Sequence, residues 1–413
     1  MRLAVFSLTC FLLTPMAQAA SSSPQTFLAE LEQAGKSGPF AQLQQRQREL
    51  LVQRLHRSAQ PFDQSGIEHV RQGAPLADET WLAAQGYDFA KAQLQQADIQ
   101  LLEGFRTLPA SLLAASTATV AQINHGATPA LQDRAVLDAE GIAYLYYLAD
   151  ALGPRLGSAF LKAYEEGKLG KAAALIKASE VSTAPAKQHF DYPRPFLRLE
   201  KPVILVADRV VVANGKPYTA SAGAFPSGHT TVGYTDSLLL AAMLPERATT
   251  LLARAAGYGY SRQVLGVHYP LDIIGGRMIA QYNVAHYLTD PAYRRLFDEA
   301  RDQLRTALTE TCGVALVQCA AEAGGADPWS SAPARTFARY TLDYGLPATR
   351  AGGYPVTVPQ NAPVLAEPLL PQLSPVQRQE RLSQADSAAE LGLDTGAEGQ
   401  WQRLDLVGAL AHP

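Results

Sequence analysis

The sequence predicts a mainly helical protein, and three observations support this fold class. Apolar residues recur at helical spacing over residues 25–60, 78–108 and 131–182. Hydrophobic residues make up 47% and charged residues 18% of the 413-residue chain, which is typical of a globular protein rather than a disordered one. Signals for extended structure are confined to one short segment after residue 201. A chain of this length forms one large domain or two ordinary ones.

The first 20 residues predict a secretory signal peptide. Arg2 supplies a positive n-region, residues 3–13 form a short apolar run, and Ala17-Gln18-Ala19 is a small-x-small cleavage site. We therefore expect a periplasmic or secreted protein that begins near Ala20. No later apolar run reaches the ~20 residues that a membrane helix needs, so a soluble protein without a membrane span is expected.

The cysteines indicate a disulfide, and the net charge argues against a nucleic-acid-binding protein. Cys312 and Cys319 follow the signal peptide, and in an exported protein such a pair predicts a disulfide. Two free buried thiols are the alternative. The net charge of −3 gives no overall attraction for nucleic acid, so any anion site has to be a local cluster of cations.

The first half of the chain predicts helices interrupted by loops. Residues 25–60 predict one or two amphipathic helices, residues 61–75 a loop, and residues 78–108 and 131–182 further helices. Gly153-Pro154 and residues 167–170 mark breaks. Residues 202–206 and 210–213 are β-branched runs, and Asn214-Gly215 is a tight-turn signal. This segment predicts a small extended or hairpin excursion.

The composition changes after residue 322, where prolines become frequent. Because proline disrupts the interior of a helix, residues 323–413 predict a Pro-rich, largely irregular extension that packs on a main helical domain of residues 21–322. One short helix is expected within residues 374–391, and residues 400–410 form a last apolar piece. The extension could be a lid, a strap or a subunit contact, so a homo-oligomer also stays open.

The block Pro226-Ser227-Gly228-His229 precedes a helical pattern over residues 230–244. A helix N-terminus offers free N–H groups and the positive end of the helix dipole, which favour an anion. Gly228 lets the backbone approach a ligand, and Ser227 adds a hydroxyl. Taken alone, this block is equally explained by an ordinary serine N-cap.

A second block contains Arg262, His268 and Asp272. Pro270 suits the first turn of a helix over residues 270–288, and His268 and Asp272 stand four residues apart on one face. Asp272 can therefore bond one ring nitrogen of His268 and leave the other as an aimed nucleophile. A metal pair is the rival interpretation, which the nearby cations disfavour, and a purely structural pair is the simplest one.

A third block supplies Lys187 and Arg194. Pro193 and Pro195 predict an extended, rigid backbone around Arg194. Arginine presents a planar fork of donors to phosphate oxygens, whereas lysine acts as a point charge. Either residue alone would be an ordinary solvated surface charge, so only the combination of blocks suggests a site.

Together the blocks resemble a known family. Lys-x6-Arg-Pro, Pro-Ser-Gly-His and Ser-Arg-x5-His-x3-Asp are the signature blocks of the type 2 phosphatidic acid phosphatase superfamily, and every position is filled in order. This superfamily includes bacterial class A non-specific acid phosphatases and vanadium-dependent haloperoxidases. The resemblance covers about residues 80–300. It implies an all-α helical bundle of the acid phosphatase / vanadium haloperoxidase type, with the site at the ends of its central helices.

The resemblance also implies a role for each residue of the blocks. His268 would be a nucleophile that forms a phosphohistidine, Asp272 would orient it, and His229 would be the general acid. The phosphate would be held by the three cations and by the backbone amides of the Pro-Ser-Gly-His block: Lys187, Arg194, Arg262, Ser227 and Gly228. With three side-chain cations to neutralise phosphoryl oxygens, no metal ion or other cofactor is expected.

We therefore expect an exported acid phosphatase that hydrolyses small phosphate monoesters with broad specificity at acid pH. The main alternative is a vanadium-dependent haloperoxidase, which would hold vanadate in the same pocket. A lipid phosphatase and a non-catalytic phosphate-binding protein are further alternatives. The chain departs from the compared acid phosphatases at Ala224, where they often carry a serine, and in its long extension.

Overall fold

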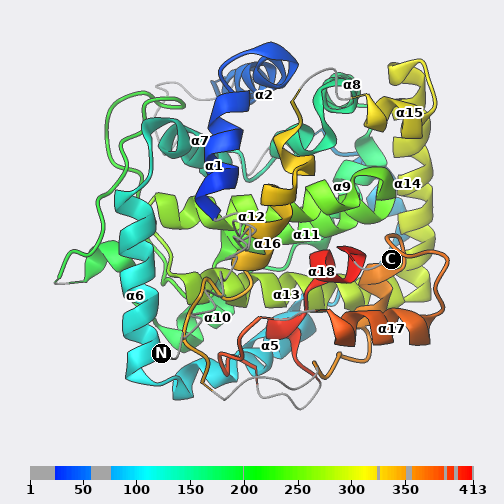
Figure 1. The fold of residues 1–413 in the computed structure, drawn as a ribbon. Helices are drawn as coiled ribbons and strands as arrows, with labels where there is room; N and C mark the ends of the chain where they lie inside the picture. Colours follow the sequence, from blue (N-terminus) through cyan, green and yellow to red (C-terminus); the bar gives the residue numbers. More distant parts are fainter. Residues whose placement is uncertain are drawn as a thin grey trace, which may run out of the picture.

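The computed structural model describes residues 24–56, 76–198, 200–322, 326–349, 356–385, 388–394 and 399–411. The predicted signal peptide and the predicted loop at residues 61–75 lie outside these ranges. The described part of the chain consists of helices and loops without a strand, which confirms the all-α fold class (Figure 1). In these ranges no helix combines the length and the apolar character needed to cross a membrane.

The N-terminal half folds into short helices that surround the centre of the molecule. Residues 25–60 give two helices rather than one, and an additional helix, α6, occupies a segment for which the sequence predicts no element. The breaks at Gly153 and at residues 167–170 separate helices as predicted. The bounds are α1 Pro24–Ala34, α2 Gly38–His56, α4 Glu79–Gln85, α5 Lys91–Leu101, α6 Ala110–His125, α7 Pro129–Glu140, η2 Tyr146–Leu152, α8 Pro154–Glu165, α9 Gly170–Ser179 and α10 Ala184–Phe190.

Three helices form the centre of the fold: α11 Gly228–Met243, α12 Ala248–Val264 and α13 Pro270–Thr289. They lie side by side across the middle of Figure 1. Glycines allow this close packing, because a Cβ atom at Gly276 would lie 2.6 Å from the Ser227 carbonyl oxygen. A Cβ atom at Gly275 would lie 2.9 Å from the Phe225 ring. This close approach brings the N-termini of α11 and α13 together.

The predicted excursion is present and runs on to Tyr218 (green, at the left of Figure 1). An antiparallel bridge between Ala207 and Pro217 closes it, and the turn passes through Gly215, whose φ is +69°. The carboxylate of Asp208 accepts the backbone N–H groups of residues 210–212, each at 2.9 Å. These bonds give a hairpin-like segment without a regular sheet.

The extension contains more regular helix than predicted: α16 Ala332–Tyr340, α17 Pro375–Gln384 and α18 Leu406–Ala411. Pro333 and Pro375 lie in the first turns of α16 and α17, where the missing N–H costs no intrahelical hydrogen bond. The expectation that prolines exclude a helix was therefore wrong at Pro333, whereas α17 is the short helix expected within residues 374–391. α16 packs on α1 and α12, and residues 362–366 and 401–403 pack on α13.

A buried arginine anchors the extension to α13. The guanidinium of Arg277 donates to the carbonyl oxygens of Leu342 at 3.2 Å and Gln402 at 2.8 Å. Arg339 of α16 also pairs with the buried carboxylate of Asp405, with Nε and Oδ2 2.9 Å apart. Both stretches of the extension are thereby fastened to the central helix whose first turn carries Asp272.

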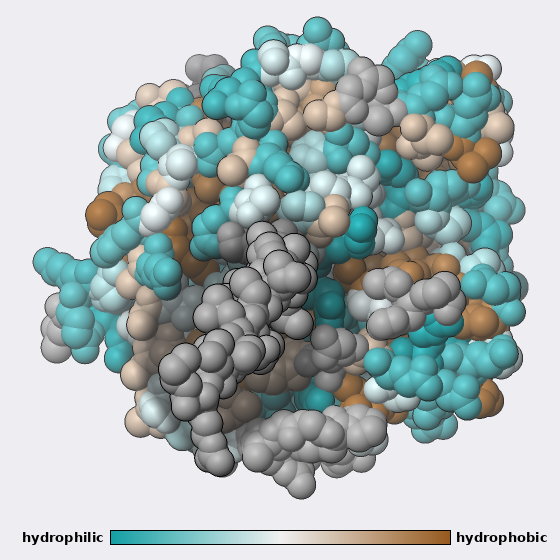
Figure 2. All heavy atoms as spheres, viewed as in Figure 1, coloured by the Kyte–Doolittle hydropathy of each residue, from teal (hydrophilic) through white to brown (hydrophobic). Residues whose placement is uncertain are grey.

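The surface in the view of Figure 2 carries hydrophilic side chains over most of its described area, with small apolar patches between them. Large apolar side chains with high exposure are Leu197, Ile204, Val317 and Val376. Isolated exposed apolar residues are normal for a globular protein and by themselves indicate no partner.

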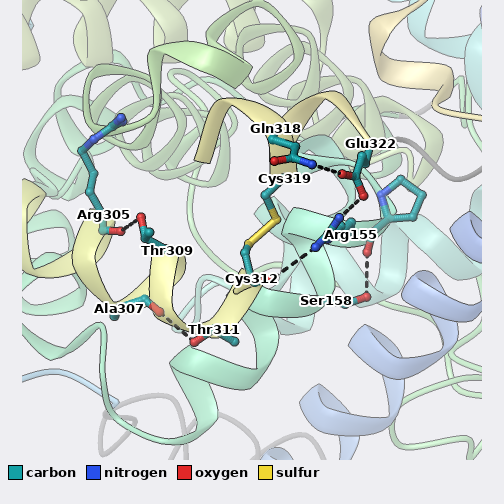
Figure 3. Close-up of a disulfide and its surroundings, with 11 residues drawn as sticks. Arg155, Ser158, Arg305, Ala307, Thr309, Thr311, Cys312, Gln318, Cys319 and Glu322 are labelled. Carbon is teal, nitrogen blue, oxygen red and sulfur yellow. Dashed lines mark hydrogen bonds and ion pairs between the residues drawn. A yellow bond between two sulfur atoms is a disulfide. The ribbon is translucent and has the colours of Figure 1, made fainter. Parts of the chain in front are cut away.

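A disulfide joins the end of α14 (Pro291–Cys312) to α15 (Leu316–Ala321), through Cys312 and Cys319. Figure 3 shows Arg155 beside it, donating to the Cys312 carbonyl oxygen at 3.2 Å and pairing with Glu322. The turn between the two helices is therefore held both by a covalent bond and by an ion pair.

Removing this disulfide is expected to destabilise the fold. Replacing both Cys312 and Cys319 by serine should lower the free energy of unfolding by about 2 kcal/mol, because the unfolded chain regains the freedom that a short closed loop removes. Urea unfolding of the variant and of the wild type measures this difference. Reduced wild-type protein should behave like the variant, and an unchanged urea midpoint in both would contradict the expectation.

Candidate active site

His268 and Asp272 form a buried pair at the N-terminus of α13. His268 Nδ1 lies 3.0 Å from Asp272 Oδ2, and the backbone N–H of Tyr269 donates to the same oxygen at 2.8 Å. The two side chains are 2% and 0% exposed. Because a carboxylate only accepts hydrogen bonds, Nδ1 carries the proton and the lone pair of His268 is on Nε2. The predicted contact between these residues is present, and it leaves the Nε2 lone pair available to other groups.

Arg194 holds its guanidinium directly against that nitrogen. Its Nη1 lies 2.8 Å from His268 Nε2 and also donates to the Val267 carbonyl oxygen at 2.9 Å. Its Nε donates to the Ala222 carbonyl oxygen at 2.7 Å. The backbone at Arg194 is extended, with φ −64° and ψ 152°, as the flanking prolines predict. An oxyanion bound by Arg194 would therefore lie next to His268.

Lys187 and Arg262 come from α10 and from the last turn of α12. Lys187 Nζ donates to the carbonyl oxygens of Gly223 at 2.6 Å and Ala224 at 3.1 Å, so the loop before α11 fixes its position. Arg262 is 1% exposed, and its Nη2 donates to the Tyr218 hydroxyl at 3.2 Å. Within the described ranges its Nε and Nη1 have no partner. Buried cationic donors without partners favour a bound anion.

Electrostatic effects show that these cations act on one imidazole. The pKa of His268 lies well below its usual value because of burial, and the charges of Arg194, Lys187, Arg262 and His229 lower it further. Burial also lowers the pKa of Lys187 to about 7, with Arg194 and Arg262 adding to the shift and Asp272 opposing it. In the free site the buried positive charges thus repel one another, and a bound anion would reduce this repulsion.

Asp272 experiences opposing influences. Burial raises the pKa of its carboxyl to about 7, while the Tyr269 N–H and the charges of Lys187 and Arg194 act in the opposite direction. The carboxyl of Asp272 and the ammonium of Lys187 thus stabilise each other's charged forms, which couples the titrations of these two groups.

Ser227 caps α11 and also links it to α13. Its hydroxyl oxygen accepts the backbone N–H of Thr230 at 3.3 Å and the Thr230 hydroxyl at 2.9 Å. The backbone N–H of Ser227 donates to the Asp272 carbonyl oxygen at 3.0 Å. In this arrangement that bond occupies the Ser227 amide, which the resemblance implies as a phosphate ligand. The Ser227 hydroxyl proton and the Gly228 amide, in the first turn of α11, are the groups left for a ligand.

His229 is held by the last turn of α7. Its Nε2 lies 3.0 Å from the Ala139 carbonyl oxygen, and because a carbonyl only accepts, Nε2 carries a proton. Carbonyl groups at a helix C-terminus lack intrahelical partners and favour a positive charge. The two histidines are thus in opposite surroundings, since cations surround His268 while a negative helix end contacts His229.

Two contacts of this site have no signal in the sequence blocks. One is the Ala139 carbonyl, a backbone group whose position depends on where α7 ends. The other is Tyr218, which belongs to the excursion and contacts Arg262 only after folding. Ala224, which departs from the compared phosphatases, is buried and contributes its carbonyl oxygen to Lys187.

Comparison with known proteins agrees with this geometry. Residues 168–295 match the PAP2 superfamily, and this segment contains all three blocks. Part of the chain is also similar to curated bacterial proteins.

These relatives are named acid phosphatases. An acid phosphatase of Zymomonas mobilis is 35% identical over 124 residues, which cover 30% of this chain and 44% of the relative. Non-specific acid phosphatases of Salmonella typhimurium and Providencia stuartii are 30% and 27% identical over 123 and 126 residues, again 30% of this chain and 46% and 48% of theirs. The chain thus spans less than half the length of each of these relatives.

Proposed function

We propose that this protein is an exported phosphatase that hydrolyses phosphate monoesters through a phosphohistidine at His268. One observation carries the proposal: Asp272 holds one nitrogen of a buried imidazole while Arg194 contacts the other. Two further cations, Lys187 and Arg262, act on the same ring. The names of the relatives, acid phosphatase and non-specific acid phosphatase, support the same reaction.

In the first step His268 Nε2 attacks phosphorus, and the bond from phosphorus to the ester oxygen breaks. The leaving oxygen takes a proton from His229, while the Nδ1 proton of His268 stays on its hydrogen bond to Asp272. In the free protein Arg194 Nη1 contacts His268 Nε2. As phosphorus approaches Nε2, the N–H of Arg194 keeps its proton but changes its hydrogen-bond acceptor from Nε2 to a phosphoryl oxygen.

In the second step water attacks the phosphorus of the phosphohistidine. His229, now neutral, accepts the water proton, the phosphorus–nitrogen bond breaks, and phosphate leaves. Lys187, Arg194 and Arg262 neutralise charge on the phosphoryl oxygens throughout, which is the task that Mg²⁺ performs in other phosphoryl-transfer enzymes. We therefore propose a reaction without a metal ion.

The lowered pKa values predict a phosphatase that works at acid pH. His268 stays neutral, and hence nucleophilic, well below the usual histidine range, whereas Lys187 is charged below about pH 7 and loses its charge above it. We expect kcat/KM to be high at mildly acid pH and to fall as the pH rises through about 7. In Lys187→Arg the charge persists, so this fall should move to higher pH, although the reshaped contact lowers the maximum.

Profiles of kcat/KM between pH 4 and 9 for both proteins measure this shift. If Asp272, whose pKa burial raises to about 7, controlled the profile, activity would instead fall as the pH decreases through 7. That profile, or an identical alkaline limb in Lys187→Arg, would contradict the expectation.

The proposed function is tested with a panel of chemically different phosphate monoesters and the purified protein, with and without EDTA. We expect hydrolysis of several of them, resistance to EDTA, and competitive inhibition by vanadate. A parallel assay with vanadate, bromide and peroxide tests the haloperoxidase alternative. Halide oxidation without ester hydrolysis would overturn the proposal, and tight phosphate binding without either reaction would indicate a binding protein.

A further inference from the structure

We infer that Tyr218 is a positioning residue of the oxyanion pocket that acts through Arg262, an inference that rests on the proposed function. Tyr218 lies outside the three sequence blocks and belongs to the excursion. It is buried, and both its hydroxyl group and its aromatic ring interact with Arg262. The hydroxyl oxygen accepts Nη2 at 3.2 Å, and the guanidinium carbon lies 5.2 Å from the ring centroid.

This contact accounts for the orientation of Arg262. In the described part of the chain, the hydrogen bond to Tyr218 is the only one that the guanidinium makes, because Nε and Nη1 have no partner. The phenol oxygen therefore fixes the position of Nη2. The face of the ring in addition attracts the positively charged guanidinium. The donors that stay unpaired are then held ready for an oxyanion.

Tyr218 also lies within electrostatic range of Arg194, the cation that touches His268. Its hydroxyl oxygen accepts from Arg262 through a lone pair, and within the described ranges its own proton has no acceptor.

The excursion holds the phenol in place. The backbone N–H of Tyr218 donates to the Val206 carbonyl oxygen at 2.8 Å, next to the bridge between Ala207 and Pro217. The carboxylate of Asp208 organises the turn by accepting three backbone N–H groups. The inferred function of the excursion is therefore to place Tyr218 against Arg262.

The test compares wild type, Tyr218→Phe and Arg262→Ala with the double variant. Phenylalanine keeps the ring and the packing but removes the oxygen that holds Nη2. We expect about a tenfold loss of kcat/KM and a similar weakening of inorganic phosphate binding, measured by calorimetry, because a hydrogen bond to a charged group is lost. The thermal unfolding midpoint should stay unchanged. Tyr340→Phe, a half-buried tyrosine of the extension, is the matched control and should retain full activity.

The double variant separates positioning from packing. If Tyr218 acts through Arg262, adding Tyr218→Phe to Arg262→Ala should cost little more than Arg262→Ala alone. Full additivity, or wild-type constants in Tyr218→Phe, would overturn the inference. If wild type hydrolyses no phosphate ester, the proposed function fails, yet the phosphate titrations still report on Tyr218. The two failures are therefore distinguishable.

Discussion

His268→Ala is expected to lower kcat for a phosphate monoester by at least about a thousandfold, since removing the nucleophile of a covalent mechanism abolishes both of its chemical steps. Binding of inorganic phosphate should persist, because Lys187, Arg194 and Arg262 stay in place. Loss of turnover with retained binding is therefore the expected pattern.

Rapid quenching with a phosphorus-labelled substrate measures the intermediate directly. Wild type should retain an acid-labile, base-stable label that His268→Ala lacks. His286→Ala is the matched control, because His286 is an exposed histidine near the far end of α13 and should leave activity unchanged. Labelling of His268→Ala at the wild-type level would exclude His268 as the nucleophile.

Gly276→Ala is expected to damage both stability and activity. The added Cβ would lie 2.6 Å from the Ser227 carbonyl oxygen and 3.0 Å from Thr230 Cβ, and neither of these can rotate away. The N-termini of α11 and α13 would have to separate, which strains the bond from the Ser227 amide to the Asp272 carbonyl oxygen. We expect a loss of about 3 kcal/mol in the free energy of unfolding and about a hundredfold loss of kcat/KM.

Urea unfolding and steady-state kinetics of the same preparation measure the two effects. Gly35→Ala is the control, because the one close contact of its Cβ, at 2.8 Å, would be with the end of the flexible Gln44 side chain, while backbone oxygens lie at 3.4 Å or more. That variant should fold and react as wild type does. If Gly276→Ala matched it in both measurements, the packing of α11 on α13 would not be what aligns the site.

Much of the fold could be predicted because several helices begin and end with local signals. Pro270 starts α13, and the Ser227 cap starts α11, within two residues of the predicted helix. α12 carries no such pattern, because it is buried around nearly its whole circumference and has no polar face to reveal a period. α6, rich in alanine, serine and threonine, likewise shows little contrast between its faces.

The side-chain contact at the centre of the candidate site could be predicted from the sequence, whereas its backbone contacts could not. The contact between His268 and Asp272 follows from a spacing of four residues on a helix. That the Ser227 amide is taken by the Asp272 carbonyl, and that the Ala139 carbonyl meets His229, depends on how helices pack. Both contacts use backbone groups, which every residue has, so no residue type in the sequence indicates them. The contact of Tyr218 with Arg262 likewise depends on how the excursion folds.

The buried guanidinium of Arg277 limits how this protein could be shortened. Ending the chain near residue 322 would remove the carbonyl groups of Leu342 and Gln402 and open Arg277 to water, together with the side of α13 on which residues 362–366 and 401–403 pack. A shortened chain would therefore expose apolar surface of a central helix that the full chain keeps covered.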